Sequence, residues 1–94
     1  MAFSIDVHFE NFEYRGMREG QGQNGRWLSL ILEDTKTRQV DVSVPSDLQE
    51  EVLAMHLSKG DYVSCDAVAY AGAEYSRIRL VRVTEHFDRD GEVL

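Results

Sequence analysis

Residues 40–60, VDVSVPSDLQEEVLAMHLSKG, decide the fold because they hold a strand, a break and a helix in that order. Valines at alternate positions of residues 40–44 give the period-two pattern of a half-buried strand. Pro45 ends the strand pairing, and Ser46 with Gln49 fits a capping box that opens a helix. Apolar residues then recur at helical spacing, and the glycine that closes the segment is suited to end the helix. We therefore predict one helix, directly after a strand.

Two strands are expected before this segment and two after it. They are residues 3–14 with a bend near Asn11, residues 27–32, residues 62–70, and residues 75–84 with a bulge or register shift near Val81. The expected domain covers residues 1–84. Residues 85–94 are highly charged, and we expect them to form a poorly ordered tail.

Three strands, one helix and two strands is the element order of a mainly β fold, the five-stranded OB barrel with its helix between strands three and four. Over residues 3–84 the chain resembles small OB-fold single-stranded-DNA-binding proteins of bacteria, phages and mobile elements. The resemblance lies in a long first hairpin loop, the position of the helix, and the closing phrase GDYVSCDAVAY…YSRIRLVRV. An SH3-like barrel would place its strands and helical turn elsewhere, and is the second choice. The resemblance implies non-catalytic binding of single-stranded DNA or RNA in replication, recombination or mobile-element transfer.

Composition narrows the functional class. The net charge of −7 argues against a purely electrostatic nucleic-acid binder, and positive charge is confined to residues 15–38 and 75–82. The single cysteine, Cys65, excludes an internal disulfide and suits a buried position in a cytoplasmic protein. No apolar run approaches the ~20 residues of a membrane span. Scattered histidines and serines give no metal spacing and no nucleophile motif, so we expect no enzyme activity, metal or cofactor.

The most distinctive segment is residues 15–26, RGMREGQGQNGR, with four of the seven glycines and three of the ten lysines and arginines. It contains a formal GxGxxG, but a strand follows where a dinucleotide-binding motif needs a helix. We expect a flexible hairpin loop that becomes ordered over a bound nucleic-acid strand.

Aromatic and basic residues make up the predicted binding site, since OB folds stack bases on exposed aromatics and hold phosphates with Arg or Lys. Trp27 lies on the strand face opposite three buried leucines and should point outward. The predicted base-stacking residues are Trp27, Tyr14 and Tyr75, and the predicted phosphate contacts are Arg15, Arg18, Arg26, Arg77 and Arg79.

Each of these predictions has a structural alternative. Trp27 could instead pack under the helix or in a dimer interface, and the fifth-strand arginines could pair with Asp66, Glu74 or the acidic tail. The main rival function is a protein-interaction module (a subunit, adaptor or inhibitor) with an acidic docking surface. A small-ligand OB domain is a third option, and homo-oligomerisation is open. A continuous basic groove beside Trp27 would favour nucleic acid over the rival.

Overall fold

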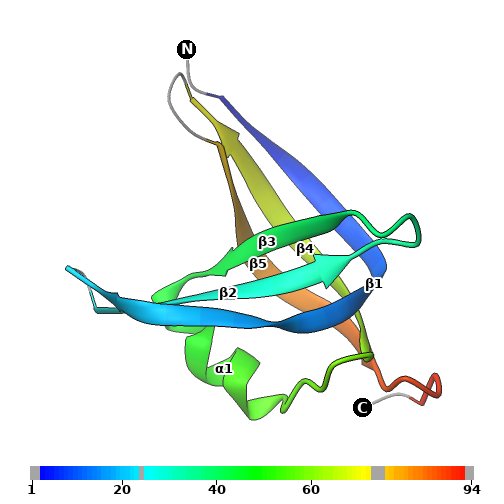
Figure 1. Ribbon diagram of the computed structural model, residues 1–94. Coiled ribbons are helices and arrows are strands. Elements are labelled where there is room, and N and C mark those ends of the chain that lie inside the picture. Colours follow the sequence, from blue (N-terminus) through cyan, green and yellow to red (C-terminus); the bar gives the residue numbers. More distant parts are fainter. Residues whose placement is uncertain (1–2, 24, 73–75, 93–94) are drawn as a thin grey trace.

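The computed structural model describes residues 3–23, 25–72 and 76–92, and shows five strands closed into a barrel (Figure 1). The elements are β1 (Phe3–Gly22), β2 (Gly25–Glu33), β3 (Gln39–Val44), the 3-10 helix η1 (Ser46–Leu48), α1 (Gln49–Ala54), β4 (Tyr62–Ala71) and β5 (Ser76–Phe87). The order around the barrel is β1-β2-β3-β5-β4, with β3 and β5 parallel and every other pair antiparallel. The predicted five-stranded OB architecture, with its helical segment between β3 and β4, is confirmed.

Alternating strand residues fill the barrel. Leu28, Leu30 and Leu32 of β2 are almost completely buried. The other strands contribute these buried residues to the same core: Val42, Val44, Val63, Cys65, Ala67 and Leu80. Val52 of α1 joins the same core, so the helix lies across one end of the barrel, below β2 in Figure 1. This core is the hydrophobic cluster that holds the strands in register.

Two irregularities bend the strands as predicted. Asn11 has a positive φ of 51°, and the β1–β4 register shifts between Phe9 and Phe12. In β5 an extra residue, Val81, separates the residues that face Ala67 and Asp66 of β4. The bend lets β1 pair with β4 along its first half and with β2 along its second half, which closes the barrel.

The helix differs from its prediction. Neither helical segment has a side-chain cap, so the capping box is wrong. The side-chain amide of Gln49 is buried and donates instead to the Arg26 carbonyl at 3.0 Å, which ties the helix to β2. The α-helix ends at Ala54 rather than at Gly60, and His56 takes a positive φ of 51° that stops helical geometry. Gly60 has a φ of 99° and donates its N–H to the Tyr14 carbonyl in the turn that leads to β4.

The predicted glycine-rich loop is wrong. β1 continues to Gly22 and β2 begins at Gly25, and these two residues face each other across a two-residue connection. Residues 15–22 are therefore strand, although glycine is a weak strand former, because cross-strand pairing with β2 holds them. The hairpin projects from the barrel as a paired arm (Figure 1).

The C-terminal boundary also lies later than predicted. β5 continues to Phe87, and His86 is buried against Asp61 at 3.0 Å. Asp88 then accepts hydrogen bonds from the N–H groups of Asp90 and Glu92. Residues 85–92 are thus part of the folded domain. The described chain contains no helix long and apolar enough to cross a membrane.

Candidate nucleic-acid interface

Aromatic, cationic and hydroxyl side chains share the outer face of the barrel wall, opposite the core. Strand register puts them there: Arg18 faces Ser29, Ser29 faces Ser43, Ser43 faces Arg79, and Tyr70 faces Arg77. Cross-strand partners point to the same side of a sheet, as do residues two apart in one strand. We call this surface the front strip: Arg18, Trp27, Ser29, Ser43, Tyr70, Arg77 and Arg79.

Trp27 is exposed, as predicted, with 48% of its surface accessible. Its indole lies over Gly20 on the neighbouring strand, so close that a Cβ atom on Gly20 would stand 2.7 Å from the ring carbons Cε2 and Cζ2. The indole therefore covers the bare backbone of β1 on one side and keeps a large part of its surface open to solvent. It does not pack under the helix. An aromatic ring held in this way offers a positioned surface for a flat ligand.

Arg77 and Arg79 extend from β5 into the strip and are both exposed. Arg77 donates from Nη2 to the Ser43 hydroxyl at 3.0 Å, and neither arginine forms an ion pair with a described residue. Asp66, which was an alternative partner, pairs instead with Arg82 at 2.8 Å and with His8 at 2.7 Å. Glu74, another alternative partner, lies outside the described residues. Within the part of the chain that the structure describes, no carboxylate neutralises either guanidinium group.

Of the other three arginines predicted to contact phosphates, one lies on the front strip and two do not. Arg18 lies on the front strip and pairs with Asp41 at 3.3 Å, both side chains being about half exposed or more. Arg15 is not on the strip: it pairs with Glu13 at 2.6 Å and with Glu33 at 3.3 Å, and the first of these contacts raises its pKa further. Arg26 immediately precedes Trp27 in β2, so it points to the opposite face of the hairpin.

Tyr14 is wrong as a base-stacking residue. It is only 5% exposed and belongs to the hydrophobic core, where burial raises the pKa of its hydroxyl. Its position follows from the bend at Asn11, because a register shift of one residue turns the next side chains to the other face. Tyr75 lies outside the described residues.

Tyr70 was not among the predicted site residues, and the structure places it at the site. The residue is 41% exposed and lies on the strip, directly across from Arg77. The alternation of β4, with Val63, Cys65 and Ala67 inward, already placed Tyr70 on the outer face. Only the β4–β5 register shows that it stands beside the two arginines.

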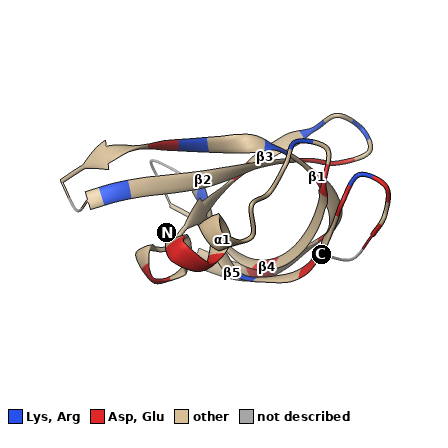
Figure 2. Cartoon of the chain, turned by 90° about the horizontal axis from the view of Figure 1, so that it is seen from below, with Lys and Arg blue, Asp and Glu red and all other residues tan. Residues whose placement is uncertain are grey.

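Charge is unevenly distributed over the molecule. The ribbon of α1 is acidic in Figure 2, while the projecting β1–β2 hairpin carries basic bands on both strands and an acidic band on β1. The acidic residues of the helical segments are Asp47, Glu50 and Glu51. Asp41 is a carboxylate that lines the same hollow as Trp27 and Arg77, and it pairs with Arg18. Among the described residues, no three His, Cys, Asp or Glu side chains gather where they could hold a metal ion.

Comparison with solved structures connects this arrangement to a known fold. The chain is similar to the mitochondrial single-stranded DNA binding protein Rim1 of S. cerevisiae in two crystal forms. One gives a TM-score of 0.67 at 16% identity over 85% of this chain and 91% of that one. The other gives a TM-score of 0.53 at 20% identity over 92% of this chain and 91% of that one.

Sequence comparison adds nothing to this, since no protein-family model and no curated protein sequence matches the chain. The likeness therefore concerns the fold. Strand order, barrel closure and the position of the helix agree with it. The chain therefore has an OB fold, which it shares with the yeast protein.

Proposed function

We propose that the protein binds single-stranded DNA across the front strip, without catalysis. The observation that carries the proposal is the juxtaposition of an exposed, positioned indole with two arginines that have no acidic partner among the described residues. Trp27 and Arg77 line one shallow hollow together with Ser29, Ser43 and Asp41, whose carboxylate pairs with Arg18. Stacking on the indole and contacts between guanidinium groups and phosphates are the two interactions by which OB folds hold single strands. The similar solved proteins are described as single-stranded DNA binding.

The chemistry of the strip predicts weak sequence discrimination. Every base has a flat face to stack, and arginine–phosphate contacts carry no sequence information. The protein as a whole has a net charge of −7, so its surface outside the strip repels nucleic acid. Binding therefore depends on a small number of local contacts, and would serve replication, recombination or mobile-element transfer.

Titration of oligo-dT at several salt concentrations tests the proposal, with Trp27 fluorescence and the anisotropy of labelled DNA as readouts. The double substitution Arg77→Ala with Arg79→Ala should weaken binding. It should also make the negative slope of log K against log salt shallower by about 1.4, because each phosphate contact on a single strand contributes about 0.7. Arg82→Ala is the matched control, since Arg82 lies on the same strand but is held by Asp66. Unchanged Trp27 emission and unchanged anisotropy for the wild type would refute the function.

A protein-interaction module is the second candidate, and one observation favours it. Arg15, Arg18, Arg38 and Arg82 are all neutralised by carboxylates, and the helical segments expose an acidic surface. A basic protein partner could bind that surface. Under this alternative, neither the wild type nor the arginine variants would bind DNA.

A further inference from the structure

Arg77 lines two hollows of the front strip. The first contains Trp27, Ser43 and Asp41, and the second contains Ser4, Tyr70 and Arg79. The Asp41 carboxylate pairs with Arg18. Arg77 is the residue that both have in common. The two hollows are therefore neighbouring parts of one surface, with an aromatic ring in each and one guanidinium group between them.

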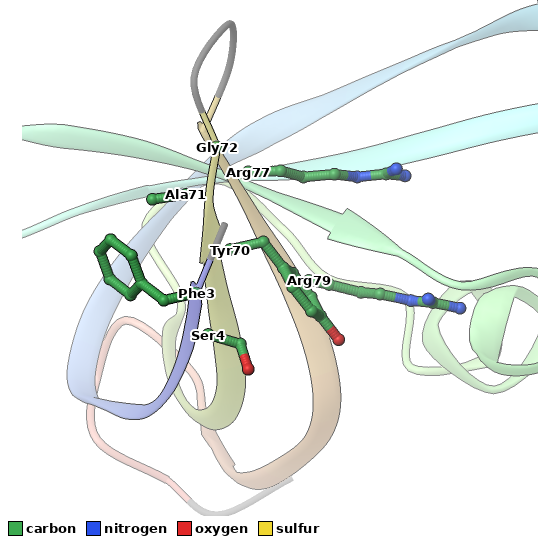
Figure 3. Close-up of a pocket in the computed structure, with 7 residues that line it drawn as sticks. All are labelled: Phe3, Ser4, Tyr70, Ala71, Gly72, Arg77 and Arg79. Carbon is green, nitrogen blue, oxygen red and sulfur yellow. The ribbon is translucent and has the colours of Figure 1, made fainter. Parts of the chain in front are cut away.

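The Tyr70 ring stands in the middle of a three-stranded arm. Strand register places it between Ser4 of β1 and Arg77 of β5. Figure 3 shows the side chains of Tyr70, Arg77 and Arg79 extending to the same side of the strands, while Phe3 extends to the other. The ring is thus an exposed flat surface accompanied by two cations, the combination that a nucleobase and its phosphate require.

Arg77 is held in place between the two rings. Its Nη2 donates to the Ser43 hydroxyl on β3 at 3.0 Å, and its other N–H donors have no partner among the described residues. A planar guanidinium fixed by one hydrogen bond is oriented to bind a phosphate with its remaining donors. Its position suits the backbone of a strand that passes from Trp27 to Tyr70.

We infer that Tyr70 is a second base-stacking platform, and that Arg77 binds the phosphate backbone between the base on Trp27 and the base on Tyr70. This rests on the proposed function and adds the path of the strand across the site. The ligand is a single-stranded oligonucleotide long enough to reach both rings. A shorter one occupies one platform at a time. Once both are reached, the second stacking event is intramolecular, so affinity should rise steeply at that length.

The test measures the affinity of oligo-dT over lengths from about two to about twelve nucleotides, a range that includes typical OB-fold site sizes. Tyr70→Leu should weaken binding of the longer oligonucleotides by about fivefold or more, because a leucine keeps apolar volume but cannot stack. The shortest should lose much less, because they can still stack on Trp27. Tyr70→Phe should bind like the wild type. Tyr62→Leu is the matched control: Tyr62 lies at the other end of β4, is 38% exposed, and faces Glu13 and Phe87.

The outcomes separate this inference from the function on which it rests. Wild-type protein that binds no oligonucleotide refutes the proposed function itself. If Arg77→Ala weakens binding but Tyr70→Leu matches the wild type at every length, the function stands and the second platform is refuted. A loss in Tyr70→Leu that is equal at all lengths, or one that Tyr62→Leu reproduces, also overturns it. Circular dichroism and thermal melting check that each variant is folded.

Discussion

Replacing Gly20 with alanine tests whether the position of Trp27 controls binding. Gly20 lies on β1 beneath the indole, and an added Cβ would stand 2.7 Å from Cε2 and Cζ2 and 2.8 Å from Nε1. Ordinary van der Waals contact requires about 3.4 Å, so the ring must move outward by about 0.7 Å or rotate to another rotamer. The indole is the mobile partner, because it is exposed while the strand beneath it is held by pairing on β2.

The expected magnitude follows from what the ring contributes. Base stacking on an aromatic side chain is worth about 1–3 kcal/mol, which sets the loss for removing Trp27 altogether. A displaced ring keeps part of this stacking energy. We therefore expect Gly20→Ala to weaken the binding free energy by about 1 kcal/mol, which raises the Kd for oligo-dT about fivefold. Stability should change little, because alanine is a better strand residue than glycine by about 0.5–1 kcal/mol and the ring can swing into solvent.

Gly22→Ala is the matched control. Gly22 is two residues along the same strand, and a Cβ there would lie 3.8 Å from Trp27 Cδ1 and from the Gly25 carbonyl, which is ordinary contact. The assay compares acrylamide quenching of Trp27 in the free proteins, followed by oligonucleotide titration. In a double-mutant cycle, Gly20→Ala should have no further effect once Trp27 is alanine, because it acts through the ring. Unchanged quenching and Kd in Gly20→Ala, or an equal loss in Gly22→Ala, would refute the reasoning.

Further predictions concern stability and reactivity. Burial alone would raise the pKa of the Asp61 carboxyl, but hydrogen bonds from His86 and from the Ser58 N–H outweigh it and hold the pKa below the ordinary 3.8. The stability that this group provides is therefore present above about pH 4 and is lost as the pH falls through the folded pKa. Urea unfolding from pH 6 to pH 3 should show the wild type losing its advantage over Asp61→Asn, and a constant difference would contradict the assignment. Burial, with a smaller contribution from the neighbouring carboxylate, raises the pKa of Cys65 to about 12. A thiol reagent at pH 8 should therefore react only in denaturant, and rapid labelling of the native protein would show that the barrel opens. Leu30→Ala removes a completely buried side chain and should lower the free energy of unfolding by about 2–5 kcal/mol, measured by chemical denaturation; a change below 1 kcal/mol would place Leu30 outside the core.

Local patterns were enough to predict the strands and the direction of several side chains. The alternation in β2 correctly placed Leu28, Leu30 and Leu32 inside and Trp27 outside, because successive strand residues point to opposite faces. The bend at Asn11 and the bulge at Val81 were visible as breaks in the same alternation. These features depend only on neighbours in the chain, and burial of the apolar set then selects the face.

Which strands pair, and in which register, could be learned only from the tertiary structure. Residues 15–22 looked like a loop because glycines favour turns, yet pairing with β2 makes them strand. Shifts in the β1 register turned Tyr14 into the core and Arg18 onto the front strip. The helix stopped at Ala54, although its apolar spacing continued, because the chain had to turn toward β4.

The amino-acid sequence by itself determined that this protein is a small β barrel with an outward tryptophan and two basic segments. The tertiary structure decided which of those residues form one surface. Tyr70, Arg77 and Trp27 lie on three different strands, and barrel closure brings them together while Arg15 is neutralised by Glu13 and Glu33. The physical reason is that strand register is set by long-range pairing and by burial of the common core, neither of which is encoded in any one segment.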